Sequence, residues 1–458
     1  MSRRFDAIVV GGGQAGPSLA ARLKGAGMEV ALVERHLLGG TCVNTGCMPT
    51  KAMVASAYAA HLARRAGDYG VAIDGHIGID MAKVTARVQG VASTARGNVE
   101  KWVAGMAHCT LLRGHARFIG PDRMTVGEEE IGAPRIFLNV GGRAHVPDMP
   151  GVNEVATLTN SSILQLTEVP SHLIVIGASY IGLEFAQAYR RFGAQVTVIE
   201  KGPRVTGRED EDVSAALQDI LSKDGIAFRL NAECIRFAPH ANGVAAGVDC
   251  AEGPPDVIGS HVLLAVGRQP NTDDLGLDAA GVATDARGYV TVNDKLETSV
   301  PGIWAMGDCN GRGAFTHTSY NDYEIVAANL LDGDDRRVSD RLPCYGLFTD
   351  PPLGRVGMGE AEAKARGHRI RIGKRPMTRV GRAVEKGEAL GFMKIVVDAD
   401  SDAILGGAIL GPGGDEAVHS ILDMMRMGAT ADALRRTVHI HPTVAELIPT
   451  IAGELKPA

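Results

Sequence analysis

The sequence lacks long apolar runs, a strong charge of either sign and a dense set of cysteines. Within its 458 residues, no apolar stretch approaches the roughly 20 residues that a membrane-spanning helix needs. A net charge of −6 argues against a nucleic acid or an anionic membrane surface as the main partner. The opening residues, MSRRF, run directly into the apolar segment AIVV and contain no secretory signal. We therefore expect a protein of the cytoplasm.

The seven cysteines are odd in number and scattered, which excludes the disulfide framework of a small secreted domain. Two of them, Cys42 and Cys47, lie close together in the segment LLGGTCVNTGCMPTKAMVASA. In a reducing compartment such a pair is more often redox-active or metal-binding than structural. The other cysteines are expected to be small buried apolar residues. They are Cys109, Cys234, Cys250, Cys309 and Cys344.

Glycine is abundant, with 58 residues, and part of it belongs to a repeat. The segment AIVVGGGQAGPSLAARLKGAGMEVALVER begins at Ala7, and LIVIGASYIGLEFAQAYRRFGAQVTVIEK begins at Leu173. Matching residues of the two copies lie 166 positions apart. Each copy reads as an apolar strand, a glycine turn, an amphipathic helix and a second strand with an acidic end. The chain therefore contains one βαβ unit written twice.

The glycines and the acidic residue of each copy suit a bound dinucleotide. In the first copy, Gly11 allows a tight turn, Gly13 lets the backbone approach a pyrophosphate, and Gly16 lets the helix pack on the strand. The phosphates lie at the helix N-terminus, and Glu34 can accept hydrogen bonds from a ribose. The equivalent residues of the second copy are Gly177, Gly182 and Glu200. The repeat thus predicts two dinucleotide sites.

The second copy also bears on the choice of coenzyme. Ser179 stands where a glycine is usual, and its small side chain still permits close approach. Glu200 favours NADH, because a carboxylate repels the 2′-phosphate of NADPH. Lys201 and Arg204 act in the opposite direction, as candidate partners of that phosphate. We expect NADH or NADPH at this site, with NADH preferred.

The cysteine pair allows three interpretations: a zinc site, a structural disulfide or a working dithiol. Zinc usually takes four ligands, and no second short pair lies near Cys42 and Cys47, so no metal is expected. A regular helix separates residues i and i+5 by roughly 7.5 Å along its axis, whereas a disulfide needs Cα atoms about 4.4–6.8 Å apart. The chain must therefore bend between them, at Asn44 to Gly46. A helix over PTKAMVASAYAAHLARR would set Cys47 near its N-terminus, which lowers the pKa of a thiol.

Four motifs carry a resemblance to a known family. GGTCVNTGCMPTK resembles the active-site segment of the FAD-dependent pyridine nucleotide–disulfide oxidoreductases, and its VNTGCMPT wording looks most like the mercuric-reductase-like branch. TSVPGIWAMGDC resembles the second FAD motif of that family, and LLAVGRQPNT resembles the end of its nicotinamide domain. HIHPTVAE resembles its C-terminal His-Pro-Thr motif. The likeness extends over nearly the whole chain.

The resemblance implies a role for each matching residue of the dithiol site. Cys42 would be the interchange thiol that attacks the substrate, and Cys47 would be the thiol next to the flavin. Lys51 would pair with Glu184 beside the flavin. Tyr180 would cover the nicotinamide pocket and swing aside when the coenzyme binds.

The resemblance also implies a homodimer with shared active sites. His441, oriented by Glu446, would be the acid/base for thiol exchange, and both would come from the other subunit. Independently, thiol exchange needs a proton donor for the leaving thiol, and histidine has a suitable pKa. The residues expected to bind the cofactors follow from the repeat and the motifs. They are Gly11, Gly13, Gly16, Glu34, Thr41 and Asp308 for FAD, and Gly177, Tyr180, Gly182, Glu200 and Gly267 for the nicotinamide coenzyme.

The expected activity is electron transfer from NAD(P)H through FAD to the Cys42–Cys47 disulfide and on to a small disulfide substrate. The alternatives are a dihydrolipoamide dehydrogenase, a mercuric-reductase-like reductase of Hg(II) or Cu(II), and a redox-sensing flavoprotein. The last segment, IAGELKPA, has no vicinal cysteine pair of the kind that mercuric reductases carry, which argues against mercury. His441 and Glu446 argue against a sensor, which does not need a placed proton donor.

The predicted architecture is α/β, with two Rossmann-like dinucleotide-binding domains and an α+β C-terminal dimerisation domain. Residues 1–148 form the first FAD segment, which includes helices around Met81 to Met106. Residues 149–268 form the NAD(P) domain, and 269–340 return to the flavin. Residues 341–458 form the interface domain, in which GFMKIVVDADSDAILGGAILG reads as two strands around a polar hairpin. Helices are expected near Asp415 to Met427.

Overall fold

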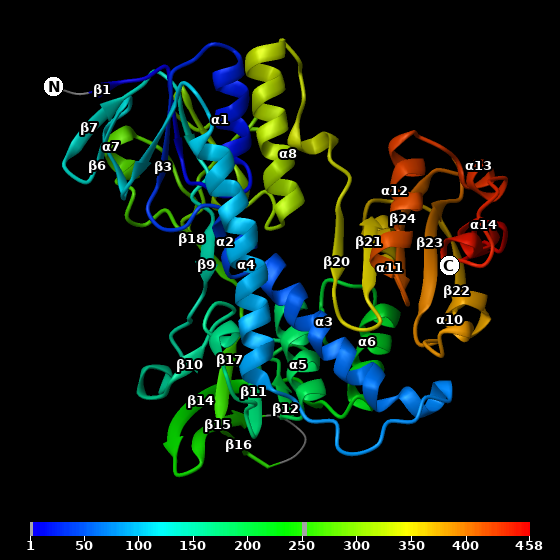
Figure 1. Cartoon of the computed structure of the whole chain (residues 1–458). Coiled ribbons are helices and arrows are strands. Elements are labelled where there is room, and N and C mark those ends of the chain that lie inside the picture. The colour runs from blue at the N-terminus through cyan, green and yellow to red at the C-terminus, as the bar shows by residue number, and fades with distance from the viewer. Residues whose placement is uncertain (1–2, 250–253) are drawn as a thin grey trace.

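The computed structural model describes residues 3–249 and 254–458. Figure 1 shows three bodies: the N-terminal part with α8 at the upper left, the middle of the chain below it, and the C-terminal part at the right. The long helices α3 (Cys47–Arg64) and α4 (Met81–Ala104) extend from the first body along the second. An apolar cluster joins side chains of α3, α4, α5 and the C-terminal sheet, so the bodies share buried surface.

The first copy of the repeat lies at the centre of a parallel five-stranded sheet. Its strand β2 is buried along its length, as expected for a strand covered on both faces. The strands, in sheet order, are β19 (Ile303–Ala305), β8 (Ile136–Leu138), β2 (Ala7–Val10), β3 (Val30–Glu34) and β4 (Cys109–Arg113). Helix α1 (Gly16–Gly25) connects β2 to β3, as the repeat predicts. Residues near 303 therefore return to the sheet that the first residues began.

The second copy builds a separate parallel five-stranded sheet of the same kind. Its strands, in sheet order, are β10 (Thr157–Leu158), β17 (His261–Leu264), β11 (His172–Ile176), β12 (Gln195–Ile199) and β13 (Ala227–Arg229). Helix α5 (Tyr180–Phe192) connects β11 to β12, and α6 (Glu211–Lys223) follows. The fold therefore contains two Rossmann-like units, as predicted.

The glycine turns of the two copies have nearly the same geometry. Gly11 has φ +108° and Gly177 has φ +103°, values that favour glycine. A Cβ on Gly16 would lie 2.0 Å from the carbonyl oxygen of Gly11, and a Cβ on Gly182 would lie 2.1 Å from that of Gly177. Because neither contact is possible, each helix can approach its strand only through a glycine.

The C-terminal body is a six-stranded antiparallel sheet flanked by helices. Its strands are β20 (Cys344–Leu347), β21 (Leu353–Gly357), β24 (Ile404–Leu410), β23 (Phe392–Asp398), β22 (Ile370–Pro376) and β25 (Lys456–Pro457). β23 and β24 form the predicted hairpin. The helices expected near 415–427 are α11 (Gly414–Ala417) and α12 (His419–Arg426). The remaining helices are α9 (Glu360–Ala365), α10 (Gly381–Glu385), α13 (Ala431–Arg435) and α14 (Ile448–Gly453).

Smaller elements complete the first two bodies. The excursion predicted as several helices around 81–106 is the single helix α4, whose N-cap Asp80 accepts a hydrogen bond from the backbone of Lys83. The first of three small sheets contains β1 (Arg3–Arg4), β7 (Glu129–Gly132), β6 (Arg123–Val126) and β5 (Ala116–Gly120). The second contains β14 (Glu233–His240), β15 (Gly243–Asp249) and β16 (Asp256–Gly259). The third pairs β18 (Arg268–Pro270) with β9 (Gly142–Ala144). The other helices are α2 (Gly40–Asn44), α7 (Leu277–Ala280) and α8 (Thr316–Ala327).

The expectation of buried structural cysteines is only partly met. Cys309 is buried, as predicted, but Cys109 and Cys344 are only partly buried. Both of these begin edge strands, β4 and β20, where one side of the backbone has no neighbouring strand. Cys250 and the side chain of Cys234 lie outside the described residues. Among the helices that the structure describes, none is long and apolar enough to cross a membrane.

Candidate active site

The two cysteines lie on consecutive helices with a break between them. Cys42 belongs to α2, which ends at Asn44, and Cys47 is the first residue of α3. The chain bends at Thr45 and Gly46, within the predicted segment. A Cβ on Gly46 would lie 2.8 Å from the carbonyl oxygen of Thr41, so the bend depends on glycine. The helix begins two residues before the predicted Pro49, and this places Cys47 itself at the helix N-terminus.

The surroundings of Cys47 favour its thiolate. A hydrogen bond from Cys42 is the largest cause that lowers the pKa of Cys47, to about 6. Burial opposes this shift, and the hydroxyl of Thr316, 3.2 Å from Sγ, and the charge of Lys51 add to it. The hydrogen bond to Cys47, and then burial, raise the pKa of Cys42. At neutral pH one thiol of the pair is therefore ionised and the other keeps its proton.

Lys51, one helical turn after Cys47, forms the ion pair that the resemblance implies. Its Nζ lies 2.6 Å from Oε2 of Glu184, which is buried on α5. The other carboxylate oxygen of Glu184 accepts a hydrogen bond of 3.0 Å from the backbone N–H of Phe348. The ring of Phe348 lies under the Lys51 ammonium, 4.3 Å from it. The pair therefore ties the dithiol helix to both the second sheet and the C-terminal body.

The acidic residues of the two copies hold the glycine turns in the same way. Glu34 accepts hydrogen bonds of 2.8 and 2.7 Å from the backbone N–H groups of Gly12 and His36. Glu200 accepts equivalent bonds of 2.8 Å from Ala178 and Gly202. Each carboxylate oxygen has two lone pairs, so both side chains keep acceptors for a ribose.

The first glycine turn fits a dinucleotide such as FAD. The N–H groups of Gly13, Gln14 and Ala15 have no acceptor within the described part of the chain, and they precede α1. A Cβ on Gly13 would lie 3.1 Å from Oδ1 of Asn139, a tight contact that glycine avoids. Unpaired N–H groups at a helix N-terminus bind phosphate.

Other residues expected to bind the cofactors lie around these turns. Asp308 receives a hydrogen bond of 3.2 Å from Nε of Arg268, and burial raises its pKa despite that cation. Gly267, with φ +123°, accepts a backbone hydrogen bond from His145. Thr41 lies on α2 beside Cys42.

Two residues of the site were not predicted from the sequence. Asn139 is buried, and its Oδ1 accepts from the N–H of Gly16 at 3.1 Å while its Nδ2 donates to the carbonyl of Met306 at 3.1 Å. It thus ties the first glycine turn to the segment before Asp308. Thr316, the partner of Cys47, lies 269 residues from it in the chain. Neither Asn139 nor Thr316 belongs to one of the four motifs, so the sequence carries no signal for these contacts.

The second glycine turn is bordered by aromatic side chains. The ring of Tyr180, the first residue of α5, lies 5.4 Å from that of Tyr345 on β20. Tyr345 in turn stacks on Phe315, with centroids 5.7 Å apart and an angle of 10°. Phe315 precedes Thr316, so this row of rings leads from the second glycine turn toward Cys47.

The segment that carries His441, between α13 and α14, lies apart from α2, which carries Cys42 (Figure 1). Nδ1 of His441 is 2.8 Å from Oε2 of Glu446, as the resemblance implies, and the side chain of His441 is 80% exposed. The segment follows α13, at the outer edge of the C-terminal body, whereas α2 lies on the other side of β20 (Figure 1). No hydrogen bond or ion pair links His441 to Cys42 or Cys47 within the described residues.

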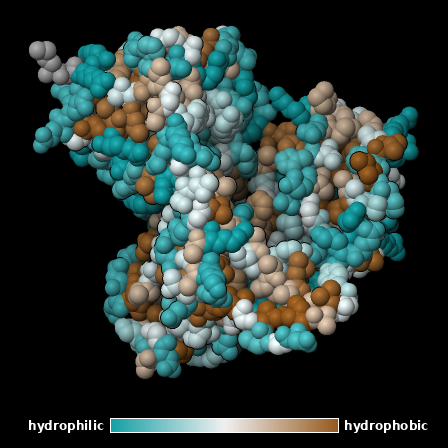
Figure 2. Space-filling view, in the orientation of Figure 1, coloured by the Kyte–Doolittle hydropathy of each residue, from teal (hydrophilic) through white to brown (hydrophobic). Residues whose placement is uncertain are grey.

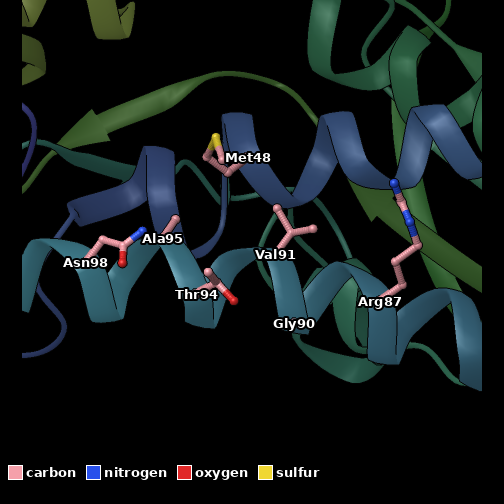
Figure 3. A pocket seen from close by; sticks show the side chains of 7 residues that line it. All are labelled: Met48, Arg87, Gly90, Val91, Thr94, Ala95 and Asn98. Atoms are coloured by element: carbon pink, nitrogen blue, oxygen red, sulfur yellow. The ribbon is translucent and has the colours of Figure 1, made fainter.

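A groove lies between α3 and α4, next to the N-terminus of α3 (Figure 3). Its volume is about 480 Å³, and Met48, which follows Cys47, lines it from α3. Val91 and Arg87 project toward α3 from α4. The Arg87 guanidinium donates to the carbonyl of Ala52 at 2.6 Å, so this cation is already bound to α3. The remaining lining residues are Gly90, Thr94, Ala95 and Asn98.

Comparisons with known proteins agree over the full length. Residues 5–322 match the pyridine nucleotide-disulphide oxidoreductase family, and 344–452 match its dimerisation domain. The chain is 34% identical to dihydrolipoyl dehydrogenase of Thermus scotoductus over 448 residues, which are 97% of this chain and 96% of the relative. It is also 34% identical to the probable pyridine nucleotide-disulfide oxidoreductase RclA of Escherichia coli K12, over 97% of each chain.

A solved structure is similar throughout. The Cu(II) complex of HOCl-induced flavoprotein disulfide reductase RclA from Escherichia coli matches 100% of both chains, with a TM-score of 0.90 and 32% identity. The match to the dimerisation domain supports a homodimer.

Proposed function

The chain belongs to the pyridine nucleotide-disulphide oxidoreductase family, whose members use FAD and NAD(P)H, and from this premise we propose how its own residues carry the reaction. Electrons pass from the nicotinamide coenzyme through FAD to the Cys42–Cys47 disulfide, and the resulting dithiol reduces a small disulfide substrate. The observation that carries the proposal is the dithiol itself. Cys47 is held as a thiolate at a helix N-terminus, beside the Lys51–Glu184 ion pair.

The two thiols have different tasks in this scheme. Bound FAD would supply the transfer of two electrons from the coenzyme to the disulfide. Lys51 and Cys42 stabilise the thiolate of Cys47 on the flavin side. Cys42 attacks one sulfur of the substrate and releases the first thiol. Cys47 then attacks Cys42, which releases the second thiol and restores the Cys42–Cys47 disulfide. Each released thiolate takes up one proton.

His441 supplies and accepts those protons in our proposal. Glu446 accepts a hydrogen bond from Nδ1 of the ring, which fixes the tautomer and leaves Nε2 for the reacting sulfur. Since His441 is exposed in its own chain, we propose that it acts on the cysteines of the partner in a homodimer. A shared site of this kind would exist only in the dimer.

The coenzyme and the location are further parts of the proposal. Glu200, fixed by two backbone N–H groups, favours NADH over NADPH because a 2′-phosphate would meet its charge. We propose a cytoplasmic location, where thiols remain reduced between turnovers. We also propose four segments as domains: 1–148 and 269–340 for FAD, 149–268 for the coenzyme, and 341–458 for the interface.

Two other substrates are supported by particular observations. The similarity to dihydrolipoyl dehydrogenases favours a dithiolane substrate, and the mainly apolar groove between α3 and α4 could receive its hydrocarbon arm. The Cu(II) complex of RclA favours a metal ion as an alternative electron acceptor. We therefore include both in the test.

The central test follows the flavin and the dithiol spectroscopically. Purified protein should contain about one FAD per chain, and two-electron reduction without oxygen should produce a long-wavelength charge-transfer band. Cys47→Ser should abolish the band, whereas Cys42→Ser should show it without a reductant, because Cys47 remains as a thiolate. Equal behaviour of the two variants would contradict the assignment of the thiols. Colourless protein that cannot be reconstituted with FAD would contradict the whole scheme.

A steady-state screen then selects the substrate. NADH and NADPH should be tested with glutathione disulfide, lipoamide, other small disulfides, Hg(II) and Cu(II). The proposal expects the highest kcat/KM with NADH and a small disulfide. A clear preference for NADPH would mean that Lys201 and Arg204 outweigh Glu200, and a preference for a metal ion would replace the disulfide as substrate.

A further inference from the structure

Glu209 is a buried carboxylate that binds two tyrosines at once. It precedes α6, and 2% of its surface is exposed. Its Oε1 accepts one hydrogen bond of 3.1 Å from the hydroxyl of Tyr180 and another of 2.7 Å from the hydroxyl of Tyr345. Tyr180 begins α5 and Tyr345 lies on β20, so the carboxylate joins the second glycine turn to the C-terminal sheet.

Both tyrosines act as donors in this arrangement. Burial, and then the charge of Glu209, raise the pKa of Tyr180. The same two causes raise the pKa of Tyr345. Each hydroxyl therefore keeps its proton and can donate it to the carboxylate. A hydrogen bond to an ionised acceptor is roughly twice as strong as one between neutral groups.

The carboxylate is held in place from the C-terminal body. Arg355 on β21 lies 4.0 Å from Oε2 of Glu209, and it also pairs with Asp210 at 3.2 Å. Lys394, fully buried on β23, binds Asp210 at 2.9 Å as well as Asp212 and Glu360 at 2.7 Å. These pairs fix the segment before α6 against the sheet. Oε2 of Glu209 accepts no hydrogen bond within the described part of the chain, so Oε1 accepts the hydrogen bonds of both tyrosines.

We propose that Glu209 and Tyr345 are positioning residues that set how readily Tyr180 swings away from the nicotinamide pocket. This inference rests on the proposed function and on the role at that pocket that the family resemblance implies for Tyr180. Glu209 stabilises the closed position, because Tyr180 must give up its hydrogen bond in order to move. Tyr345 stabilises the open position, because it continues to donate to a buried carboxylate that would otherwise have no hydrogen-bond donor.

The two roles predict effects of opposite sign. Tyr180→Phe removes the bond that opening must break, so NAD⁺ should bind about tenfold more tightly. Glu209→Gln weakens the same bond without removing the acceptor, so binding should tighten by a few-fold. Tyr345→Phe leaves the carboxylate without a hydrogen-bond donor in the open state, so binding of NAD⁺ should weaken by a few-fold to about tenfold. The double variant of the two tyrosines should fall between the single variants.

The experiment compares NAD⁺ with ADP-ribose by calorimetry on the oxidised, FAD-loaded protein. ADP-ribose has the adenosine, both phosphates and the second ribose but no nicotinamide, so it does not require Tyr180 to move. The dissociation constant of NAD⁺ divided by that of ADP-ribose therefore reports only the movement of Tyr180. NADP⁺ and 2′-phospho-ADP-ribose replace the pair if the phosphorylated coenzyme binds better. Tyr69→Phe, which removes an exposed hydroxyl bonded to the carbonyl of Lys386, is the matched control.

The expected result is a ratio that falls in Tyr180→Phe, rises in Tyr345→Phe and stays constant in Tyr69→Phe, while ADP-ribose binds equally to all four proteins. A ratio that is unchanged in both site variants, or that moves in the same direction in both, would overturn the inference and leave the proposed function intact. Failure of the wild type to bind either nucleotide would overturn the proposed function and the inference with it.

Discussion

Cys47 and His441 have different tasks in the proposed mechanism, and they differ in how many side chains of their own chain contact them. Cys47 has partners from three helices of its own chain: Cys42 on α2, Lys51 on α3 and Thr316 on α8. His441 has one such partner, Glu446, and its side chain is 80% exposed. Both residues are exposed on their own chain, so the difference lies in the number of partners that each one has.

Two residues beside His441 are exposed as well. Val438 is 96% exposed and Ile440 is 80% exposed, although both side chains are apolar. Figure 2 shows hydrophobic side chains on the outer surface of the C-terminal body. Clustered apolar side chains on a surface mark contact with another molecule. The comparison indicates that the surface beside His441 suits contact with a second copy of the chain, in agreement with the match to the dimerisation domain.

The largest effect is expected from removing the histidine. Positioned acid/base groups contribute about 10²–10⁴-fold, so His441→Ala should lose that much disulfide turnover while NADH still reduces the flavin quickly. Stopped-flow and steady-state assays separate the two steps. If flavin reduction fell equally, His441 would not be specific to thiol exchange.

The same variant tests whether the histidine acts on the partner. Mixing His441→Ala with inactive Cys42→Ser under conditions of subunit exchange should restore activity, because one site of each heterodimer is intact. A mixture of Cys42→Ser and Cys47→Ser should regain nothing, since both changes affect the same half of the site. Demonstrated exchange without recovery would rule out the shared site.

The next effect concerns the apolar segment beside His441. Burying each of two such side chains contributes about 1.5–3 kcal/mol, so the double change Val438→Asp and Ile440→Asp should weaken dimerisation by at least about 10²-fold. Sedimentation velocity over a dilution series measures this. Ile119→Asp, on β5 of a small sheet, changes an exposed residue elsewhere and serves as control. A dimer that resists the double change would place the interface on another surface.

A smaller effect is expected when Cys47 loses its hydrogen bond from Cys42. Because the pKa of Cys47 is lowered to about 6, its alkylation by iodoacetamide should fall only as the pH drops through about 6. Cys42→Ala removes the main hydrogen bond, so the midpoint should rise toward ~8.5 and the thiolate fraction at pH 7 should fall by up to about 30-fold. Cys42→Ser keeps a donor and should remain close to the wild type. The Cys47→Ser variant measures the alkylation of the other cysteines, which is subtracted. Equal alkylation midpoints in Cys42→Ala and Cys42→Ser would exclude the hydrogen bond as the cause of the lowered pKa of Cys47.

The smallest effect is expected from Lys51. Its charge lowers the pKa of Cys47 less than the Cys42 hydrogen bond does, so Lys51→Met should raise the midpoint slightly and slow alkylation at pH 6 by a few-fold. The same pH titration measures it. A shift larger than that of Cys42→Ala would reverse the order of causes and make the ion pair the main support of the thiolate.

The local parts of this molecule could be predicted from the sequence because their causes are local. The two βαβ copies, with Gly11 and Gly177 at positive φ, follow from the spacing of apolar residues and glycines. The bend between Cys42 and Cys47 follows from their spacing, because a regular helix would hold two residues five apart too far from each other to form a disulfide. The residue types that suit phosphate, ribose and thiol chemistry also lie within short motifs, so these residues can be identified without the fold.

The contacts between distant segments were decided only by the tertiary structure. Thr316 reaches Cys47 across 269 residues, and Tyr345 reaches Glu209 across 136. No periodicity or spacing signals such a pair, because the two segments meet only after separate sheets have formed and packed against each other. The same packing adds the hydroxyl of Thr316 to the partners of Cys47, and it buries Glu209 beside the hydroxyls of two tyrosines. The sequence by itself therefore determined which residues can do the chemistry, and the packing of the three bodies decided which distant side chains contact and hold them.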